Sequence, residues 1–264
     1  MHDGRVPLGR GSAGKLKILN VATQGLLYLD WPYDFQLDFL WWANMGCVQL
    51  ESEIISLLFF QQHDALPVIV KVPDEKPKED FLLAYSCMPA ALTPIEKIKD
   101  KKVVLFTKAV EKWTEYYKSC PNIEIKKAGP DFADYLSRCS GLIASPSPGV
   151  VTQALSVGTP CYLICPPGHL EQQFNEDYYF KYFTGVTNPE RTELTAWASA
   201  VKPEQDQSLA QQAKSVREWL LQFDAQAEKL VIPALRRAMT PGAGFGSTKP
   251  QAYPAAVGGP TAMV

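Results

Sequence analysis

Two polar turns in the middle of the chain carry the residues best suited to chemistry, and each follows an apolar run of strand length. The first turn covers residues 145–149, a Ser-Pro-Ser-Pro-Gly segment that opens a helical stretch. The second turn carries hydrogen-bonding side chains at His169, Glu171, Gln172 and Asn175. Helix N-termini beside the carboxyl ends of parallel strands bind phosphorylated ligands. The two turns therefore predict a nucleotide-sugar site, with a diphosphate at the first turn and a sugar at the second.

The elements that would position these turns alternate regularly along the chain. Strands are expected at residues 81–87, 103–107, 123–126, 142–145 and 161–165. Helices are expected between and after them, at residues 93–99, 111–120, 131–139, 150–157 and 171–183. Thr93 and Asp131 would be N-caps, Pro94 would take a first helical position, and Gly158 would end the fourth helix. Strands that alternate with helices in this way predict an α/β fold with a doubly wound parallel sheet.

The segments on either side are less regular. Strands are expected near residues 17–21, 24–29 and 66–72, helices at 36–44 and 51–60, and a charged linker at 73–80. Apolar residues at helical spacing predict C-terminal helices that continue to Met239, with a kink or break near Pro233; they include Leu209, Ala213, Val216, Leu220 and Phe223. Residues 1–15 are expected to be flexible, and residues 240–264, which are rich in Gly and Pro, are expected to be disordered.

Composition narrows the class of protein. The chain has 264 residues, of which 46% are hydrophobic and 20% charged, and its net charge is −2. This composition is ordinary for a soluble globular protein. The slightly negative net charge gives no sign of the positive electrostatic field with which proteins attract nucleic acids. The six cysteines form no CxxC pair, so they are interpreted as buried thiols in a reducing compartment rather than as disulfide or zinc ligands. No secretory signal and no membrane-spanning run are visible, so a cytoplasmic protein is expected.

Around the two turns the sequence resembles the nucleotide-sugar-binding half of GT-B glycosyltransferases, closest to glycosyltransferase family 28. The matching residues are Gln153-Ala154-Leu155, the turn Gly158-Thr159-Pro160, and the loop from His169 to Asn175. The segment from Asp131 to Cys139 is similar to the one that precedes the first turn in that family. The resemblance covers about residues 66–200. It implies a Rossmann-like domain and a hexosyltransferase with a nucleotide-sugar donor, UDP being the expected nucleotide.

The resemblance also implies roles for individual residues. Backbone N–H groups at Ser147, Gly149 and Val150 would hold the donor diphosphate, Gln153 would face the ribose, and Phe132 would contact the base. The sugar would be held by His169, Glu171, Gln172 and Asn175. The reaction would be direct displacement at the anomeric carbon with inversion, and neither a metal nor another cofactor is expected. The acceptor and the catalytic base are not identified.

Three positions depart from the family pattern. Ser147 stands where the family has Gly, Val150 where it has Thr, and Gln153 where it has a Glu that accepts two ribose hydroxyls. Gln153 keeps a hydrogen bond but loses the charge-assisted strength of a carboxylate. Gly149 would move the tight turn by two residues. A changed donor and a lost activity are both consistent with these departures.

Length is a larger departure, because a GT-B enzyme has two Rossmann-like domains and the N-terminal one contributes most of the acceptor site. Residues 16–65 resemble only the last part of such a lobe. The expected division is a partial lobe at 16–65, a nucleotide-sugar-binding domain at 66–203 and C-terminal helices at 204–239. A separate N-terminal lobe or a homo-oligomer would then be a partner.

Each candidate also has a purely structural interpretation. The first turn could be an ordinary strand–helix connection, Glu171 and Gln172 could cap a helix, and His169 could be a structural loop residue. For Phe132 a position in the core is preferred. An aromatic patch could contact a membrane or a lipid acceptor, but a core helix left partly uncovered is preferred; the patch is formed by Phe35, Phe39, Trp41 and Trp42.

Two other functions stay open. The chain could be a non-catalytic or partner-dependent donor-binding fragment of a degenerate glycosyltransferase, as Val150 and Gln153 suggest. It could also be a nucleotide-sugar 2-epimerase, which shares the fold. That activity needs carboxylates and histidines from both lobes, and the chain has only three histidines, so it ranks last.

Overall fold

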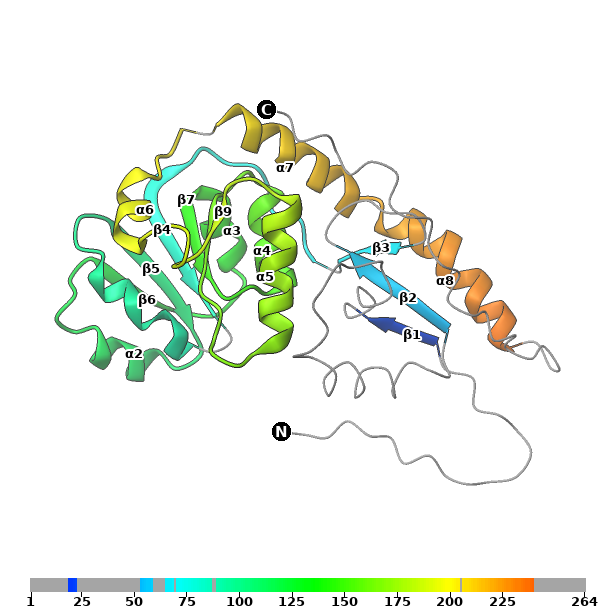
Figure 1. Ribbon diagram of the computed structural model, residues 1–264, viewed down its shortest axis with the longest axis horizontal. Coiled ribbons are helices and arrows are strands. Elements are labelled where there is room, and N and C mark those ends of the chain that lie inside the picture. Colours follow the sequence, from blue (N-terminus) through cyan, green and yellow to red (C-terminus); the bar gives the residue numbers. More distant parts are fainter. Residues whose placement is uncertain are drawn as a thin grey trace, which may run out of the picture.

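A six-stranded parallel sheet forms the larger part of the computed structural model (Figure 1), which describes residues 19–22, 53–58, 65–68, 70–86, 89–204 and 206–239. Its strands are β4 (Glu79–Tyr85), β5 (Lys102–Thr107), β6 (Ile123–Lys127), β7 (Cys139–Ala144), β8 (Cys161–Leu163) and β9 (Val186–Thr187). Their order is β6-β5-β4-β7-β8-β9, and every neighbouring pair is parallel. The chain moves outward from β4 to β6 and then returns to the other side of β4. This confirms the predicted doubly wound α/β fold.

Both faces of this sheet are covered, so its central strands are apolar on both sides. Leu83 and Phe106 belong to one core, which is closed by α3 (Phe132–Arg138), α4 (Pro148–Leu155), α5 (Leu170–Tyr182) and α7 (Gln207–Leu220). Leu82 and Leu105 belong to the core on the opposite face. That core is closed by η2 (Pro89–Lys97, a 3-10 helix), α2 (Val110–Tyr116) and α6 (Leu194–Ala200). The alternation along each strand therefore fixes which helices lie over which face.

A second, smaller parallel sheet has the order β1-β2-β3, formed by β1 (Leu19–Ala22), β2 (Glu53–Leu58) and β3 (Ala65–Pro67). The last helix, α8 (Phe223–Met239), lies beside these strands (Figure 1). Leu66, which is only 2% exposed, packs there against apolar side chains of α8: Phe223, Ala227, Leu230 and Val231. Helices α7 and α8 thus connect the two sheets, and α8 continues through Pro233 without a break.

Several expectations for single elements are wrong. The helix expected over residues 51–60 is instead strand β2, because pairing with β1 and β3 outweighs an apolar run that fits either structure. Thr93 is not an N-cap, since η2 already begins at Pro89 and contains Pro94 in its interior. Strand β9 is not expected from the sequence, because its two residues are too few to show a periodic pattern. Gly158 does take the left-handed conformation expected after α4, with φ of 66°.

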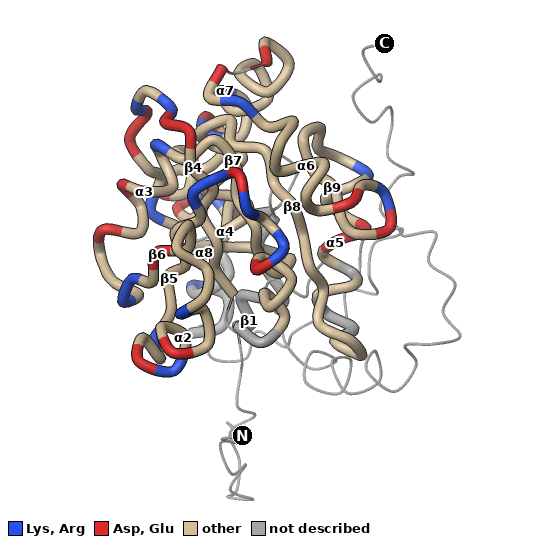
Figure 2. The backbone as a smooth tube through the Cα atoms, turned by 90° about the vertical axis from the view of Figure 1, so that its left-hand side faces the viewer, with Lys and Arg blue, Asp and Glu red and all other residues tan. Residues whose placement is uncertain are grey.

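Other predictions fall on residues that the structure does not describe. They are the flexible and disordered ends at 1–15 and 240–264, the strand at 24–29, and the helix at 36–44 with the aromatic patch at Phe35, Phe39, Trp41 and Trp42. Among the described helices, none is both long and apolar enough to cross a bilayer. Figure 2 shows basic and acidic positions interspersed along the described chain, in keeping with the net charge of −2.

Candidate functional site

The carboxyl ends of β4 and β7 mark the point where the chain reverses its direction of travel across the sheet. Ser86 follows β4 and Ser145 follows β7, and the Ser86 hydroxyl lies 3.2 Å from the Ser145 hydroxyl oxygen. Both residues are buried. Doubly wound sheets bind ligands in the crevice at such a reversal. The first predicted turn therefore begins at the place where this fold most often holds a ligand.

Helix α4 starts directly at this crevice and presents an open N-terminus. Ser147 is its N-cap, with an extended backbone and no hydrogen bond from its side chain to the helix. Pro148 follows and has no backbone N–H. Among the described residues, no acceptor binds the backbone N–H groups of Gly149 and Val150. The backbone N–H of Ser147, also expected to hold the diphosphate, instead donates to the Ser145 carbonyl oxygen at 2.6 Å. The Gly149 and Val150 donors, at the positive end of the helix dipole, can hold an anion.

Gly149 and Val150 themselves have different surroundings from those expected. Gly149 lies inside the first turn of α4 and does not form a tight turn of its own. A Cβ on Gly149 would lie 3.7 Å from Val70 Cγ1, an ordinary contact, so the glycine is not required by the fold. The Val150 side chain is half-buried and packs against the same core as Val70 and Val72. Since an apolar side chain makes no hydrogen bond, the backbone N–H of Val150 is the group that could bind a diphosphate.

The Gln153 side chain already makes a hydrogen bond within the protein. Its amide Nε2 donates a hydrogen bond to the carbonyl oxygen of Lys71, at 2.6 Å. The residue therefore fastens the segment before β4 onto α4. This contact uses one of the two N–H donors of the amide and leaves the other donor and the side-chain carbonyl for a ligand, so the ribose role of Gln153 stays a prediction.

The second turn is a helix start in which capping and candidate binding coincide. His169 is the N-cap of α5, and its Nδ1 accepts a hydrogen bond from the Gln172 backbone N–H at 3.4 Å. The side chain of Gln172 is buried. Glu171 lies in the first turn of α5, where a carboxylate is favoured by the helix dipole. The N-cap of α5 is therefore His169, rather than Glu171 or Gln172, and the sugar contacts of all three residues stay predictions.

Asn175 brings the two turns together. Its side chain is buried and its Nδ2 donates a hydrogen bond to the Pro146 carbonyl oxygen at 3.1 Å. One turn further along α5, the Tyr179 hydroxyl lies 3.5 Å from the Ser147 carbonyl and 3.4 Å from that of Pro148. The sequence gives no sign of this role for Tyr179, although its spacing of four residues from Asn175 places both on one helix face.

Phe132 lies in an aromatic cluster at the same edge of the sheet. Its ring centroid is 5.1 Å from that of Tyr85 and 5.4 Å from that of Phe106. The Phe132 side chain is only partly buried and packs against the core of this face. Phe132 therefore packs onto the core without being one of its fully buried residues. The exposed remainder of the ring leaves its contact with a base as a prediction.

Glu176 is an ionisable group at this edge that the sequence analysis does not identify. Its pKa is raised to about 7, first because burial disfavours the carboxylate and then because Asp177 and Glu190 repel it, while a hydrogen bond from Asn188 acts in the opposite direction. Burial, followed by the charges of Glu176 and Asp177, also raises the pKa of the Cys165 thiol to about 11. Glu176 thus lies near the ends of β8 and β9. Only its position directly after Asn175 could have drawn attention to it.

Metal ligands are a separate question. In the part of the chain that the structure describes, no group of three or more His, Cys, Asp or Glu residues is arranged to hold a metal ion. The described cysteines Cys120, Cys139, Cys161 and Cys165 are free thiols. The expectation of a reaction without a metal stays a prediction.

Comparison with known proteins finds its matches among solved structures. No protein-family model matches the sequence, and no curated protein matches it. The calicheamicin glycosyltransferase CalG4 aligns with 78% of this chain at 16% sequence identity and a TM-score of 0.51. The chain shares its fold with GT-B glycosyltransferases.

Two further matches are weaker. MurG from Acinetobacter baumannii aligns with 71% of the chain at 14% identity and a TM-score of 0.46. The glycosyltransferase VinC, solved in complex with dTDP, aligns with 70% at 15% identity and a TM-score of 0.43. The alignments cover 59% of CalG4, 62% of MurG and 52% of VinC. The chain therefore spans between about half and three fifths of the glycosyltransferases it resembles.

Proposed function

We propose that this chain binds a nucleotide-sugar donor, expected to be a UDP-sugar, at the carboxyl ends of β7 and β8 and transfers the sugar to an acceptor. The observation that carries the proposal is the hydrogen bond from Asn175 to the Pro146 carbonyl, which joins the polar start of α5 to the open start of α4. The fold shared with CalG4 supports it at the level of architecture.

The chemistry follows from the two helix starts. The N–H groups of Gly149 and Val150 and the dipole of α4 would stabilise negative charge on the diphosphate as the bond to the anomeric carbon breaks. Glu171, Gln172 and Asn175 would orient the sugar hydroxyls. The acceptor oxygen would attack from the opposite face, with inversion, and a base outside the described site would remove its proton.

A non-catalytic or partner-dependent donor-binding fragment is the second candidate. One observation favours it: the Gln153 amide is already bound to the Lys71 carbonyl. Both candidates bind UDP-sugar. The two candidates are distinguished by incubating the chain alone with the donor. A transferase with a complete site would hydrolyse the UDP-sugar slowly, and a non-catalytic fragment would not.

Substitution of Ser147 separates donor binding from folding. Ser147→Asp supplies a better N-cap and a charge that suits the helix dipole, so stability should rise by about 0.5–1 kcal/mol. The same carboxylate would repel a diphosphate, and UDP affinity should fall about 10- to 100-fold. The measurement is calorimetric titration of UDP and then UDP-hexoses, with thermal unfolding of each variant alongside.

Ser147→Asn is the matched control, because it caps the helix without charge and should bind UDP within about threefold of the native affinity. Equal affinity of the Asp and Asn variants would place the diphosphate elsewhere. No heat from millimolar UDP with the folded native chain would exclude a working donor site.

A further inference from the structure

A cavity of about 440 Å³ lies at the opposite edge of the large sheet from the proposed donor site. Its lining comes from residues at the amino ends of strands and from the connection between α6 and α7. Lys78 precedes β4, Ser140 is at the start of β7, and Pro160 precedes β8. Since a strand of six residues is roughly 20 Å long, a ligand in this cavity cannot touch the start of α4.

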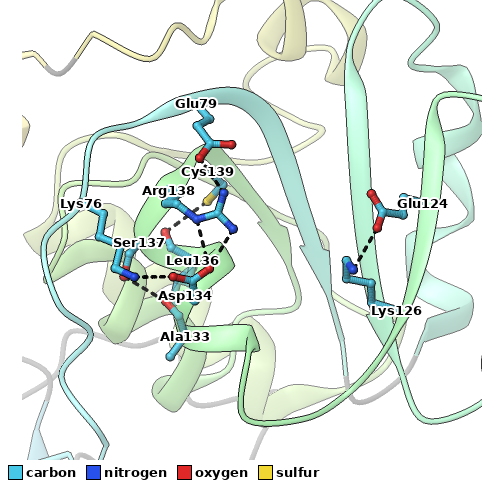
Figure 3. Close-up of polar contacts among 10 residues, drawn as sticks. All are labelled: Lys76, Glu79, Glu124, Lys126, Ala133, Asp134, Leu136, Ser137, Arg138 and Cys139. Carbon is cyan, nitrogen blue, oxygen red and sulfur yellow. Dashed lines mark hydrogen bonds and ion pairs between the residues drawn. The ribbon is translucent and has the colours of Figure 1, made fainter.

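Ion pairs made by the residues on both sides of Lys78 fix the chain at this cavity. Glu79 binds Arg138 at 2.5 Å, and Lys76 binds Asp134 at 2.5 Å, as Figure 3 shows. Asp80 binds Lys101 at 2.8 Å. These pairs anchor the chain on both sides of Lys78, whose Nζ donates to Thr159 Oγ1 at 2.5 Å.

The ammonium group of Lys78 has no carboxylate partner among the described residues. It has three N–H donors, and the hydrogen bond to Thr159 uses one of them. Burial lowers the pKa of Lys78, opposed only by the thiols of Cys139 and Cys161. A half-buried cation with unused donors costs free energy that an anionic ligand would offset.

The rest of the cavity determines which anion would fit. Pro160, Val201 and Leu209 provide an apolar wall. Lys202, Glu204 and Asp206 also line the cavity. Lys202 and Glu204 are exposed to solvent, and the Asp206 carboxylate caps α7 by accepting a hydrogen bond from the Ser208 backbone N–H at 2.7 Å. A ligand with one carboxylate and a short apolar body would match both the cation and the wall, and the volume is in the range of small-molecule sites.

We propose that this cavity is a second ligand site, which binds a small organic carboxylate through Lys78. The site is independent of the donor site, because it shares none of that site's residues and lies at the other edge of the sheet. A ligand there would contact both the segment before β4 and the connection from α6 to α7.

The test uses sodium hexanoate as the probe and the full chain. Hexanoate at millimolar concentration should raise the Tm of the native protein by about 2–4 °C when it reaches roughly ten times its Kd. Lys78→Met should fold, since methionine fills similar space without charge, and should lose this shift. Lys214→Met, on the exposed surface of α7, should keep it.

A second measurement needs no variant. Reductive methylation of the native protein, read by peptide mass spectrometry, should be several-fold slower at Lys78 in hexanoate and unchanged at Lys214. The proposal is overturned if hexanoate leaves the methylation rate of Lys78 unchanged. It is equally overturned if 1-hexanol, sodium chloride or inorganic phosphate at matched concentration reproduces the thermal shift, or if Lys78→Met retains it.

Discussion

At the scale of single residues, Glu176 at the carboxyl edge of the sheet has a raised pKa because of its surroundings. Glu176 is followed by another acid, lies near Glu190, and receives one hydrogen bond from Asn188. One of its carboxylate oxygens, Oε1, is buried and has no hydrogen-bond partner among the described residues. The charged form is therefore poorly solvated, which explains a pKa near 7.

Glu176→Gln should stabilise the protein in a pH-dependent manner. The folded pKa of about 7 exceeds the ordinary value of 4.5, so the favourable contribution of Glu176 is complete below pH 4.5 and is lost as the pH rises through 7. The glutamine variant should accordingly gain about 1–2 kcal/mol at pH 8 and little at pH 4.5. Urea unfolding at the two pH values measures this.

Asp177→Asn is the control for a general loss of negative charge, because Asp177 is exposed. Its effect should be under about 0.5 kcal/mol at both pH values. A gain for Glu176→Gln that is the same at pH 4.5 and pH 8 would contradict the burial of a charged carboxylate.

At the scale of elements, α5 supports the first turn through two side chains on one face. Asn175 makes a hydrogen bond of 3.1 Å with Pro146. The contacts of the Tyr179 hydroxyl with the Ser147 and Pro148 carbonyls are longer, at 3.5 Å and 3.4 Å. Hydrogen bonds weaken over this range, so the two residues should contribute unequally to the position of the turn.

Asn175→Ala should lower stability by about 1–2 kcal/mol, because it leaves the Pro146 carbonyl without this donor, and should weaken UDP binding about tenfold. Tyr179→Phe, the matched control on the same face, should change each quantity by less than about 0.5 kcal/mol. The measurements are urea unfolding and calorimetric titration. If Asn175→Ala lost stability but kept its UDP affinity, the bond would hold the fold together without positioning a donor site.

Much of this architecture can be predicted from local pattern. Strands β4, β5, β6, β7 and β8 and helices α2 to α5 follow apolar runs and turn residues that alternate clearly. Strand β2 cannot be predicted in this way, because its apolar run fits a helix equally well and one of its two partners, β1, is distant in sequence. The contact of Asn175 with Pro146 spans 29 residues, and that of Lys78 with Thr159 spans 81 residues. Such contacts depend on the order of the strands in the sheet. Local sequence pattern can therefore suggest which residues belong to a site, but not which hydrogen bonds they make within the protein.

At the scale of the whole molecule, the two sheets have separate cores. Strands β1 to β3 pack against α8, and the six-stranded sheet packs against its own helices (Figure 1). The hydrogen bond from Arg217 on α7 to the Pro73 carbonyl, at 2.7 Å, is one of the direct ties between the C-terminal helices and the segment before β4. Two cores joined by a helix pair and a linker should open independently.

Leu66→Ala tests this independence. Leu66 is 2% exposed and surrounded by partly buried side chains of α8, so its loss should cost about 2–3 kcal/mol within the smaller unit. Hydrogen exchange measured by mass spectrometry should accelerate over residues 53–58 and 223–239 and stay unchanged over 79–187. Leu82→Ala, in the core of the larger sheet, should give the reverse pattern. Faster exchange throughout the chain in both variants would show a single cooperative unit, and the chain would then unfold as one domain despite its two sheets.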